Sequence, residues 1–168
     1  KQWAIPVDKK RKPELFSHLL KRRRWGQVLV FVKTRKGVEQ LVATLQGQGI
    51  GADSIHGDKP QPARLRALER FKAGQVQILV ATDVAARGLD IDDLPLVVSH
   101  GLASDLDTHT HRIGRTGRAG ESGLALSLVA SEDRRRIIGI EEQLGKAVRW
   151  ERIDLSRKPG KPAPAAMT

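Results

Sequence analysis

The sequence predicts an α/β fold in which a parallel β-sheet is covered by helices on both faces. Short, continuous runs of Val, Ile, Leu and Ala alternate along the chain with longer stretches whose apolar residues recur every three or four positions. Continuous apolar runs are typical of strands that are buried on both faces, and their alternation with helices is typical of parallel sheets. The 168 residues suffice for a single domain with its own core.

Five segments are expected to be strands: residues 28–32, 52–55, 78–81, 96–99 and 124–129. Helices are expected over residues 12–24, 36–46, 62–72 and 133–144, because each places large apolar side chains along one face. Glycines 26, 47, 49, 74 and 101 separate these elements. We expect residues 1–155 to form the folded domain and residues 156–168, which contain three prolines and three basic residues, to form a disordered tail.

The charge of the chain indicates a polyanionic partner. Lys and Arg number 30 against 19 Asp and Glu, which gives a formal net charge of +11, and nucleic acid is the first candidate for the partner. With no Tyr and only three Trp and three Phe, platforms for base stacking are scarce, so we expect contacts to the nucleic-acid backbone. The absence of Cys excludes disulfides and thiolate metal sites. No apolar run is long enough to span a membrane, and we expect a cytoplasmic protein.

Polar groups follow the expected strands, where ligands bind in open parallel sheets. Thr34 follows the first strand and, taken alone, is better explained as a helix N-cap than as a phosphate contact. Arg64 fits a phosphate contact and a plain surface position equally well, whereas His56 is expected to be a buried, hydrogen-bonded histidine. Thr82 ends a strand, with Asp83 beside it to cap a short helix. Asp90 could contact a sugar hydroxyl or hold an arginine in place.

The most informative segment has the sequence HRIGRTGR and runs from His111 to Arg118. Its arginines, Arg112, Arg115 and Arg118, recur every three residues, which on a helical turn would fan them across one broad face. The guanidinium group suits phosphate oxygens, and the interleaved glycines allow close approach. The alternative is a solvated basic helix end. His109 and His111 diverge on a helix and have no evident third ligand, so no metal site is expected.

Taken in order, these segments resemble the second RecA-like domain of DEAD-box RNA helicases, most like bacterial members of the RhlE type. Residues 28–34 resemble motif IV, residues 55–64 the IHGD…QxxR segment, residues 81–91 motif V and residues 111–118 motif VI. The resemblance extends from about Ile5 to Leu144. The motif VI string is specific, because related helicase groups usually begin it with Gln rather than His.

This resemblance implies that ATP binds between two RecA-like domains and that RNA lies across both. Arg115 and Arg118 would be catalytic arginine fingers that reach the γ-phosphate of ATP on the other domain. Gly88 and Asp90 would meet the ribose of the nucleotide. His111 and Arg112 would couple the two domains, with Arg112 bracing the motif.

For RNA, the resemblance implies a grip formed by Thr34, Gly57, Arg64 and Thr82 on phosphates and sugars, independent of base sequence. The sequence contains neither a GxxxxGK[ST] phosphate loop nor a DEAD tetrapeptide, so Mg²⁺ would be held mainly by the first domain. We therefore expect a monomeric half of an ATP-dependent helicase that does not hydrolyse ATP alone. The alternative is a non-catalytic RNA-binding or adaptor module that retains the fold. Half of a DNA translocase is disfavoured by the His that begins motif VI.

The chain departs from the family just before motif VI. Residues 99–103 read SHGLA where the family usually has NYDLP, and His109-Thr110 replace Tyr-Val. The substitutions remove aromatic and proline packing from the segment that positions the arginines, and they predict either lower local order there or weaker ATP hydrolysis.

Overall fold

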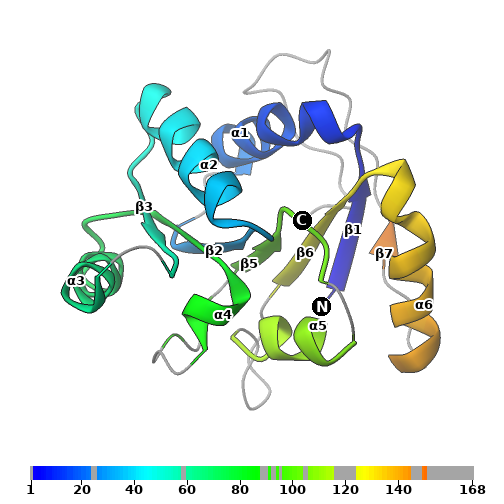
Figure 1. The fold of residues 1–168 in the computed structure, drawn as a ribbon. Helices are drawn as coiled ribbons and strands as arrows, with labels where there is room; N and C mark the ends of the chain where they lie inside the picture. The colour runs from blue at the N-terminus through cyan, green and yellow to red at the C-terminus, as the bar shows by residue number, and fades with distance from the viewer. Residues whose placement is uncertain are drawn as a thin grey trace.

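The computed structural model describes residues 2–23, 26–57, 60–87, 91, 94, 96–103, 106–115, 124–144 and 149–150. Within these residues the chain forms one sheet with helices on both faces (Figure 1). The predicted α/β fold with a parallel sheet is therefore confirmed. None of the helices in the described part of the chain is long and apolar enough to cross a membrane.

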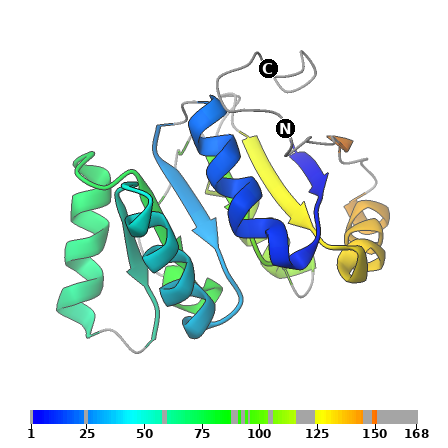
Figure 2. The ribbon, with the colours of Figure 1, turned by 90° about the horizontal axis from the view of Figure 1, so that it is seen from above.

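The sheet has seven strands within the described residues, arranged in the order β3-β4-β2-β5-β6-β1-β7. Every pairing among them is parallel, and Figure 2 shows the long strands running in one direction. The strands are β1 (Gln2–Pro6), β2 (Val28–Phe31), β3 (Ala52–Ile55), β4 (Ile78–Ala81), β5 (Leu96–Ser99), β6 (Leu124–Val129) and β7 (Arg149–Trp150). All five predicted strands are present, whereas β1 and β7 were not predicted.

The helices are α1 (Lys12–Arg23), α2 (Arg35–Gly47), α3 (Gln61–Lys72), α4 (Asp83–Ala86), α5 (Leu106–Ile113) and α6 (Arg134–Leu144), with short 3₁₀ segments η1 (Lys9–Arg11) and η3 (Ser131–Asp133). The four predicted helices match α1, α2, α3 and α6 within one residue at each end. Gly49 and Gly74 follow α2 and α3 with φ of 77° and 79°, a left-handed conformation that glycine adopts without strain.

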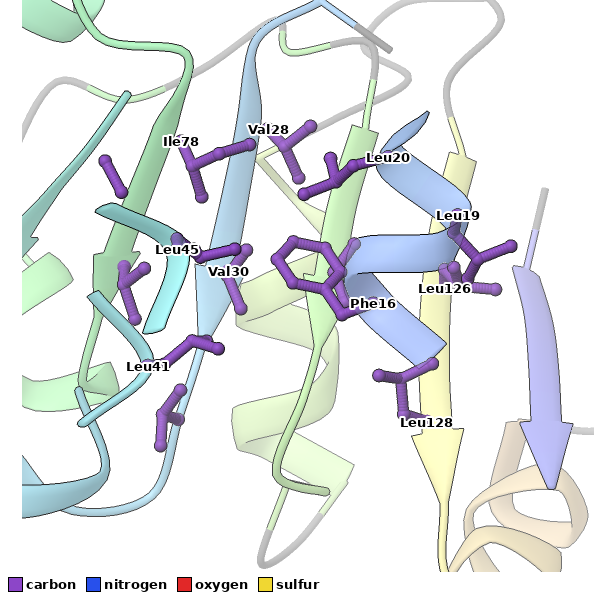
Figure 3. Packing of buried hydrophobic residues seen from close by; sticks show 14 of the residues in the cluster. Phe16, Leu19, Leu20, Val28, Val30, Leu41, Leu45, Ile78, Leu126 and Leu128 are labelled. Carbon is purple, nitrogen blue, oxygen red and sulfur yellow. The ribbon is translucent and has the colours of Figure 1, made fainter. Parts of the chain in front are cut away.

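The core lies on both faces of the sheet because successive strand residues point to opposite sides. On one face, Phe16 of α1 and Leu45 of α2 lie over Val30 of β2, and Leu19 of α1 lies beside Leu126 of β6 (Figure 3). On the other face, Leu29 and Phe31 of β2 pack against a cluster that includes Leu68 and Phe71 of α3 and Ala85 of α4. Figure 1 accordingly shows α1 and α2 on one side of the sheet and α3, α4 and α5 on the other.

Backbone hydrogen bonds continue past the carboxyl ends of the central strands. The amide of Val32 donates to Ala81 O (3.0 Å), and the amide of Thr82 donates to Ile55 O (3.3 Å). The amides of His100 and Gly101 both donate to Phe31 O, at 3.0 and 3.2 Å. These bonds hold the segments that follow β3, β4, β2 and β5 beside one another, so groups far apart in the sequence share one edge of the sheet.

Candidate functional site

Two threonines begin helices at this edge of the sheet. Thr34 is the N-cap of α2, where its Oγ1 accepts from the amide of Gly37 at 3.0 Å. Thr82 is the N-cap of α4, where its Oγ1 accepts from the amide of Ala85 at 3.4 Å. The sequence assigned the α4 cap to Asp83, but Asp83 is the first helical residue, because the threonine hydroxyl already takes the cap. A capping hydroxyl uses only a lone pair, so each threonine keeps its hydrogen for donation to another group.

Gly57 and Arg64 lie at the end of the sheet beyond β3. A Cβ added at Gly57 would meet only Arg35 Cδ, at 4.0 Å, and Gly57 is not in the left-handed region, so its own chain does not require glycine there. Arg64 lies in the first turns of α3 and is half-buried. Its Nε is buried and has no hydrogen-bond partner among the described residues. This orphaned donor is unusual, since buried polar groups are nearly always paired.

His56 is a buried, satisfied histidine, as the sequence predicted. Its side chain is 7% exposed, and its Nε2 lies 2.5 Å from Oε1 of Glu39 on α2. The hydroxyl of Ser54 donates to the same Glu39 oxygen at 3.0 Å. Glu39 therefore ties the end of β3, which leads to Gly57, to the helix that begins at Thr34.

Arg112 occupies the interior of the site. It is 2% exposed, and its guanidinium grips Asp83 through two bonds, Nε to Oδ1 at 2.6 Å and Nη2 to Oδ2 at 2.7 Å. Its Nη1 donates to Ser99 Oγ (3.0 Å) and to Gly101 O (2.6 Å), and its Cζ lies 5.0 Å from the centroid of the Phe31 ring. A buried arginine with a bidentate carboxylate joins α5 to α4 and to the ends of β2 and β5.

The expectation that the arginines of this motif fan across one helical face is wrong for the two that the structure describes. Helix α5 ends at Ile113, and the chain turns at Gly114, a poor helix former. Arg112 therefore points inward from the last helical turn, while Arg115 follows the turn. The carbonyl of Arg115 accepts from the amide of Leu94 at 3.0 Å. In its side chain, Nη2 of Arg115 lies 3.3 Å from Nε2 of His111.

A cavity of about 460 Å³ lies between α5 and the end of α4. Arg115 and the exposed His111 line it, together with Gly114. It is also lined by Arg87, Asp107 and Thr110, which the sequence did not single out as site residues. Arg87 follows α4 by one residue, and its place in the motif V string was the only signal that could have identified it. The cavity is therefore basic on two sides.

Three predicted site residues, Gly88, Asp90 and Arg118, lie outside the described residues, so their assignments stay predictions. The same holds for the tail of residues 156–168. Among the described residues, no group of three or more His, Cys, Asp or Glu could hold a metal ion.

The divergent segment before α5 packs tightly where it is described, so the lower local order is not found there, and weaker ATP hydrolysis stays a prediction. Leu102 and Ala103 are fully buried, and His100 makes an edge-on ring contact with Phe16 at 6.1 Å between centroids. His109 is buried, and its Nε2 lies 2.9 Å from Gln2 Oε1. The smaller and more polar side chains fill these positions because they pair with residues of β1 and α1.

Burial changes the acidity of this segment. It lowers the pKa of His100 to about 4, with a smaller effect from the nearby positive charge of Lys12. Burial also lowers the pKa of His109, and Arg112 adds to that effect. Nε2 of His100 and Nδ1 of His109 are buried without hydrogen-bond partners among the described residues, so both rings sit in the structure in their neutral form.

The family profile "Helicase conserved C-terminal domain" matches residues 11–120. The chain belongs to this family. The matched range contains the helix caps at Thr34 and Thr82, the Arg112 cluster and the cavity beside Arg115, so the geometry described above is that of a helicase C-terminal domain.

Relatives place the domain within the DEAD-box group. The chain is 40% identical over 162 residues to DEAD-box ATP-dependent RNA helicase 24 of Arabidopsis thaliana, which covers 94% of this chain and 21% of the relative. It is 49% identical over 108 residues to the probable ATP-dependent RNA helicase ddx42 of Dictyostelium discoideum, which covers 64% of this chain and 11% of that protein. The chain thus spans about a fifth or less of the length of these relatives.

Solved structures give the same fold. The E. coli DEAD-box protein SrmB, solved in complex with regulator of ribonuclease activity A, matches with a TM-score of 0.85 and 36% identity over 98% of this chain and 96% of that one. The C-terminal domain of the DEAD-box protein Dbp5 matches with a TM-score of 0.83 and 30% identity, covering 94% of this chain and 91% of that one. The fold is therefore the RecA-like fold of DEAD-box C-terminal domains.

Proposed function

We propose that this chain is the second RecA-like domain of an ATP-dependent RNA helicase of the bacterial RhlE type. It presents arginine fingers to ATP held by a first domain and grips the RNA backbone. The names of its relatives and the fold shared with SrmB support the enzyme class. In this proposal the complete protein is cytoplasmic, the chain itself is a monomer, and Mg²⁺ and the phosphates of ATP are held mainly by the first domain.

The observation that carries the nucleotide side of the proposal is the separation of Arg112 from Arg115. Arg112 is fully engaged inside the domain, whereas Arg115 lines the cavity with Arg87 and His111. A guanidinium that lines a cavity together with a second arginine is suited to a polyphosphate that arrives from outside. In this proposal Arg115 and Arg118 meet the γ-phosphate, Gly88 and Asp90 meet the ribose, and His111 orients Arg115 and couples the domains.

The proposed RNA contacts rest on groups that the fold of the chain does not itself use. Thr34 and Thr82 each retain a hydroxyl hydrogen, Arg64 Nε is an orphaned donor, and Gly57 is a glycine that its own chain does not require. Together they offer donors and close approach at neighbouring strand ends. Such a surface favours phosphates and sugars over bases.

The nucleotide side also suggests how ATP and RNA binding are linked. Asp83, which Arg112 grips, directly follows Thr82. A displacement of the turn at Arg115 would therefore move the start of α4, where the proposed RNA contact lies. We assign Arg112 the role of a positioning residue in this link.

The test is to join the chain to a DEAD-box first domain and to measure RNA-stimulated ATP hydrolysis. We expect Arg115→Ala and Arg118→Ala each to lower turnover by about 10³- to 10⁵-fold, because a finger stabilises charge in the phosphoryl-transfer transition state. The matched control is Arg70→Ala, which removes an exposed arginine from α3 and should leave turnover unchanged. Unchanged turnover in both finger variants would refute the finger assignment. A joined protein that binds RNA but is inert would favour the adaptor function.

A further inference from the structure

The structure brings two basic segments of the chain together at the β6–β1 end of the sheet. β1 and β6 pair in parallel with Pro6 opposite Val129, and the amide of Val7 donates to Val129 O at 2.9 Å. The basic segment Lys9–Arg11 follows β1, and residues 134–136, all arginines, follow β6. The starts of α1 and α6 accordingly meet in both views (Figures 1 and 2). Lys12 Nζ, 4.0 Å from Asp133 Oδ2, connects the two segments directly.

These six exposed side chains form what we call the basic rim: Lys9, Lys10, Arg11, Arg134, Arg135 and Arg136. Four carboxylates lie among them, on Asp8, Glu14, Glu132 and Asp133. Arg11 bonds Glu14 at 3.1 Å, and Arg136 lies 3.9 Å from Asp133. Lys9, Lys10 and Arg135 have no acidic partner within the described part of the chain. The rim therefore carries positive charge that its own surroundings do not neutralise.

A cavity of about 860 Å³ joins the basic rim to the proposed RNA grip. Thr34 and the exposed Lys33 line it on the side of β2, and Lys9 and Lys12 line it on the side of β1. Glu132 and Asp133 also line it, and Lys12 offsets the charge of Asp133. β2 and β1 are three strand spacings apart in the sheet order, about 15 Å at ~4.8 Å per strand. A strand of RNA only a few nucleotides long covers that length.

We propose that the basic rim is a second RNA contact, which holds the phosphates of nucleotides that flank the segment gripped by Thr34, Gly57, Arg64 and Thr82. The inference rests on the proposed function, since it requires that the chain bind RNA. Exposed lysine and arginine side chains suit the phosphates of the RNA backbone rather than base edges. The contact lengthens the RNA footprint from the β3–β4–β2 ends of the sheet to its β1 end.

The test compares the affinity of this chain for RNA of two lengths. Oligouridines of 5 and 15 nucleotides are titrated over a series of salt concentrations by fluorescence anisotropy. The shorter one can occupy the ends of β3, β4 and β2, whereas the longer one can occupy those ends and the rim together. The variant is Lys9→Ala/Lys10→Ala/Arg135→Ala. The control, Lys21→Ala/Arg70→Ala/Lys72→Ala, removes the same charge from the last turns of α1 and α3.

The rim variant should bind the 15-mer about tenfold or more weakly at low salt. Its plot of log K against log salt should lose about 2 units of slope, because three phosphate contacts disappear at ~0.7 each. Its affinity for the 5-mer should match that of the unmodified chain, and the control should change neither. Equal losses on both lengths, no loss on the 15-mer, or an equal loss in the control would overturn the proposal.

A further variant separates this proposal from the one on which it rests. Arg64→Ala should weaken binding of both oligonucleotides, because it removes a contact in the grip. If Arg64→Ala does so and the rim variant changes neither length, the RNA grip stands and the basic rim is no RNA contact. If the unmodified chain binds neither oligonucleotide, both proposals are wrong.

Discussion

Arg112 and Arg115 are three residues apart in one motif, yet they belong to two different regions of the molecule. Arg112 ends in the interior, with five polar or aromatic contacts to α4, β2 and the end of β5. Arg115 follows the turn that ends α5 and lines a cavity at the rim. The repeat in the sequence is the same for both, but the helix stops between them, so Arg112 is buried in the domain and Arg115 lines the cavity.

The two sides of the candidate site differ in the same way. On the Arg112 side, charge is buried and matched by a bidentate carboxylate, so its removal is expected to affect stability. On the side of Thr34, Gly57 and Thr82, the groups are caps and turns with unused donors or unused space. Changes there are expected to affect binding more than folding. The following predictions probe that division.

The largest effect is expected for Asp83→Asn, which keeps the shape of the side chain but leaves the buried charge of Arg112 without its carboxylate. We expect the free energy of unfolding to fall by about 3–5 kcal/mol, measured by urea denaturation. The control is Glu14→Gln, which breaks the exposed pair with Arg11 by the same chemical change. It should cost less than about 1 kcal/mol. Similar losses in the two variants would mean that the buried cluster is no more important than a surface pair.

An intermediate effect is expected from pH, through His100. The pKa of His100 is about 4 in the folded chain, where the ring is buried, and 6.5 in the unfolded chain, where water reaches the ring. As the pH falls, the unfolded chain therefore takes up a proton before the folded chain does. The contribution to stability is complete above pH 6.5 and is lost between pH 6.5 and 4, by on the order of 3 kcal/mol. His109, whose pKa is also lowered, adds a loss of the same sign.

The measurement is urea denaturation at pH 7.5 and pH 4.5 for the unmodified chain and for His100→Phe, which keeps a ring beside Phe16. The unmodified chain should lose about 2–3 kcal/mol more than the variant between the two pH values. If both lose the same amount, His100 is not the group that makes the segment acid-sensitive.

The smallest effect is expected for Gly57→Ala. Because the added Cβ meets nothing closer than 4.0 Å, stability should stay the same or rise by up to about 1 kcal/mol. RNA affinity should fall several-fold if a backbone approaches this position closely. Thermal unfolding and RNA titration of one preparation measure both quantities. A loss of stability would show that glycine serves the fold, and unchanged RNA affinity would remove Gly57 from the grip.

The sequence predicted the long elements well because their apolar patterns decide them locally. Residues 52–55, 78–81, 96–99 and 124–129 coincide with strands, and α2 begins directly after Thr34, which was expected to be its N-cap. β1 was missed because it offers only Trp3, Ala4 and Ile5 before a proline, and its pairing with β6 and β7 creates it. Such a strand depends on tertiary contacts rather than on local propensity.

Within the site, the residue types were predictable but their directions were not. The spacing of Arg112 and Arg115 predicts one face only if the helix continues, but α5 ends at Ile113, and the carbonyl of Arg115 beyond the turn accepts from Leu94 N. The carboxylate that holds Arg112 is 29 residues away in the chain. The same limit applies to the basic rim, because two ordinary basic segments become one surface only when β1 pairs with β6.

The difference between Arg112 and Arg115 is tested most directly by the free energies of unfolding of Arg112→Ala and Arg115→Ala, measured side by side in this chain. The structure predicts a loss of about 3–5 kcal/mol for Arg112→Ala, because Asp83 is left without its partner, and a change within about 1 kcal/mol for Arg115→Ala. Equal losses, or a larger loss for Arg115→Ala, would contradict the assignment of one arginine to the fold and the other to an outside ligand.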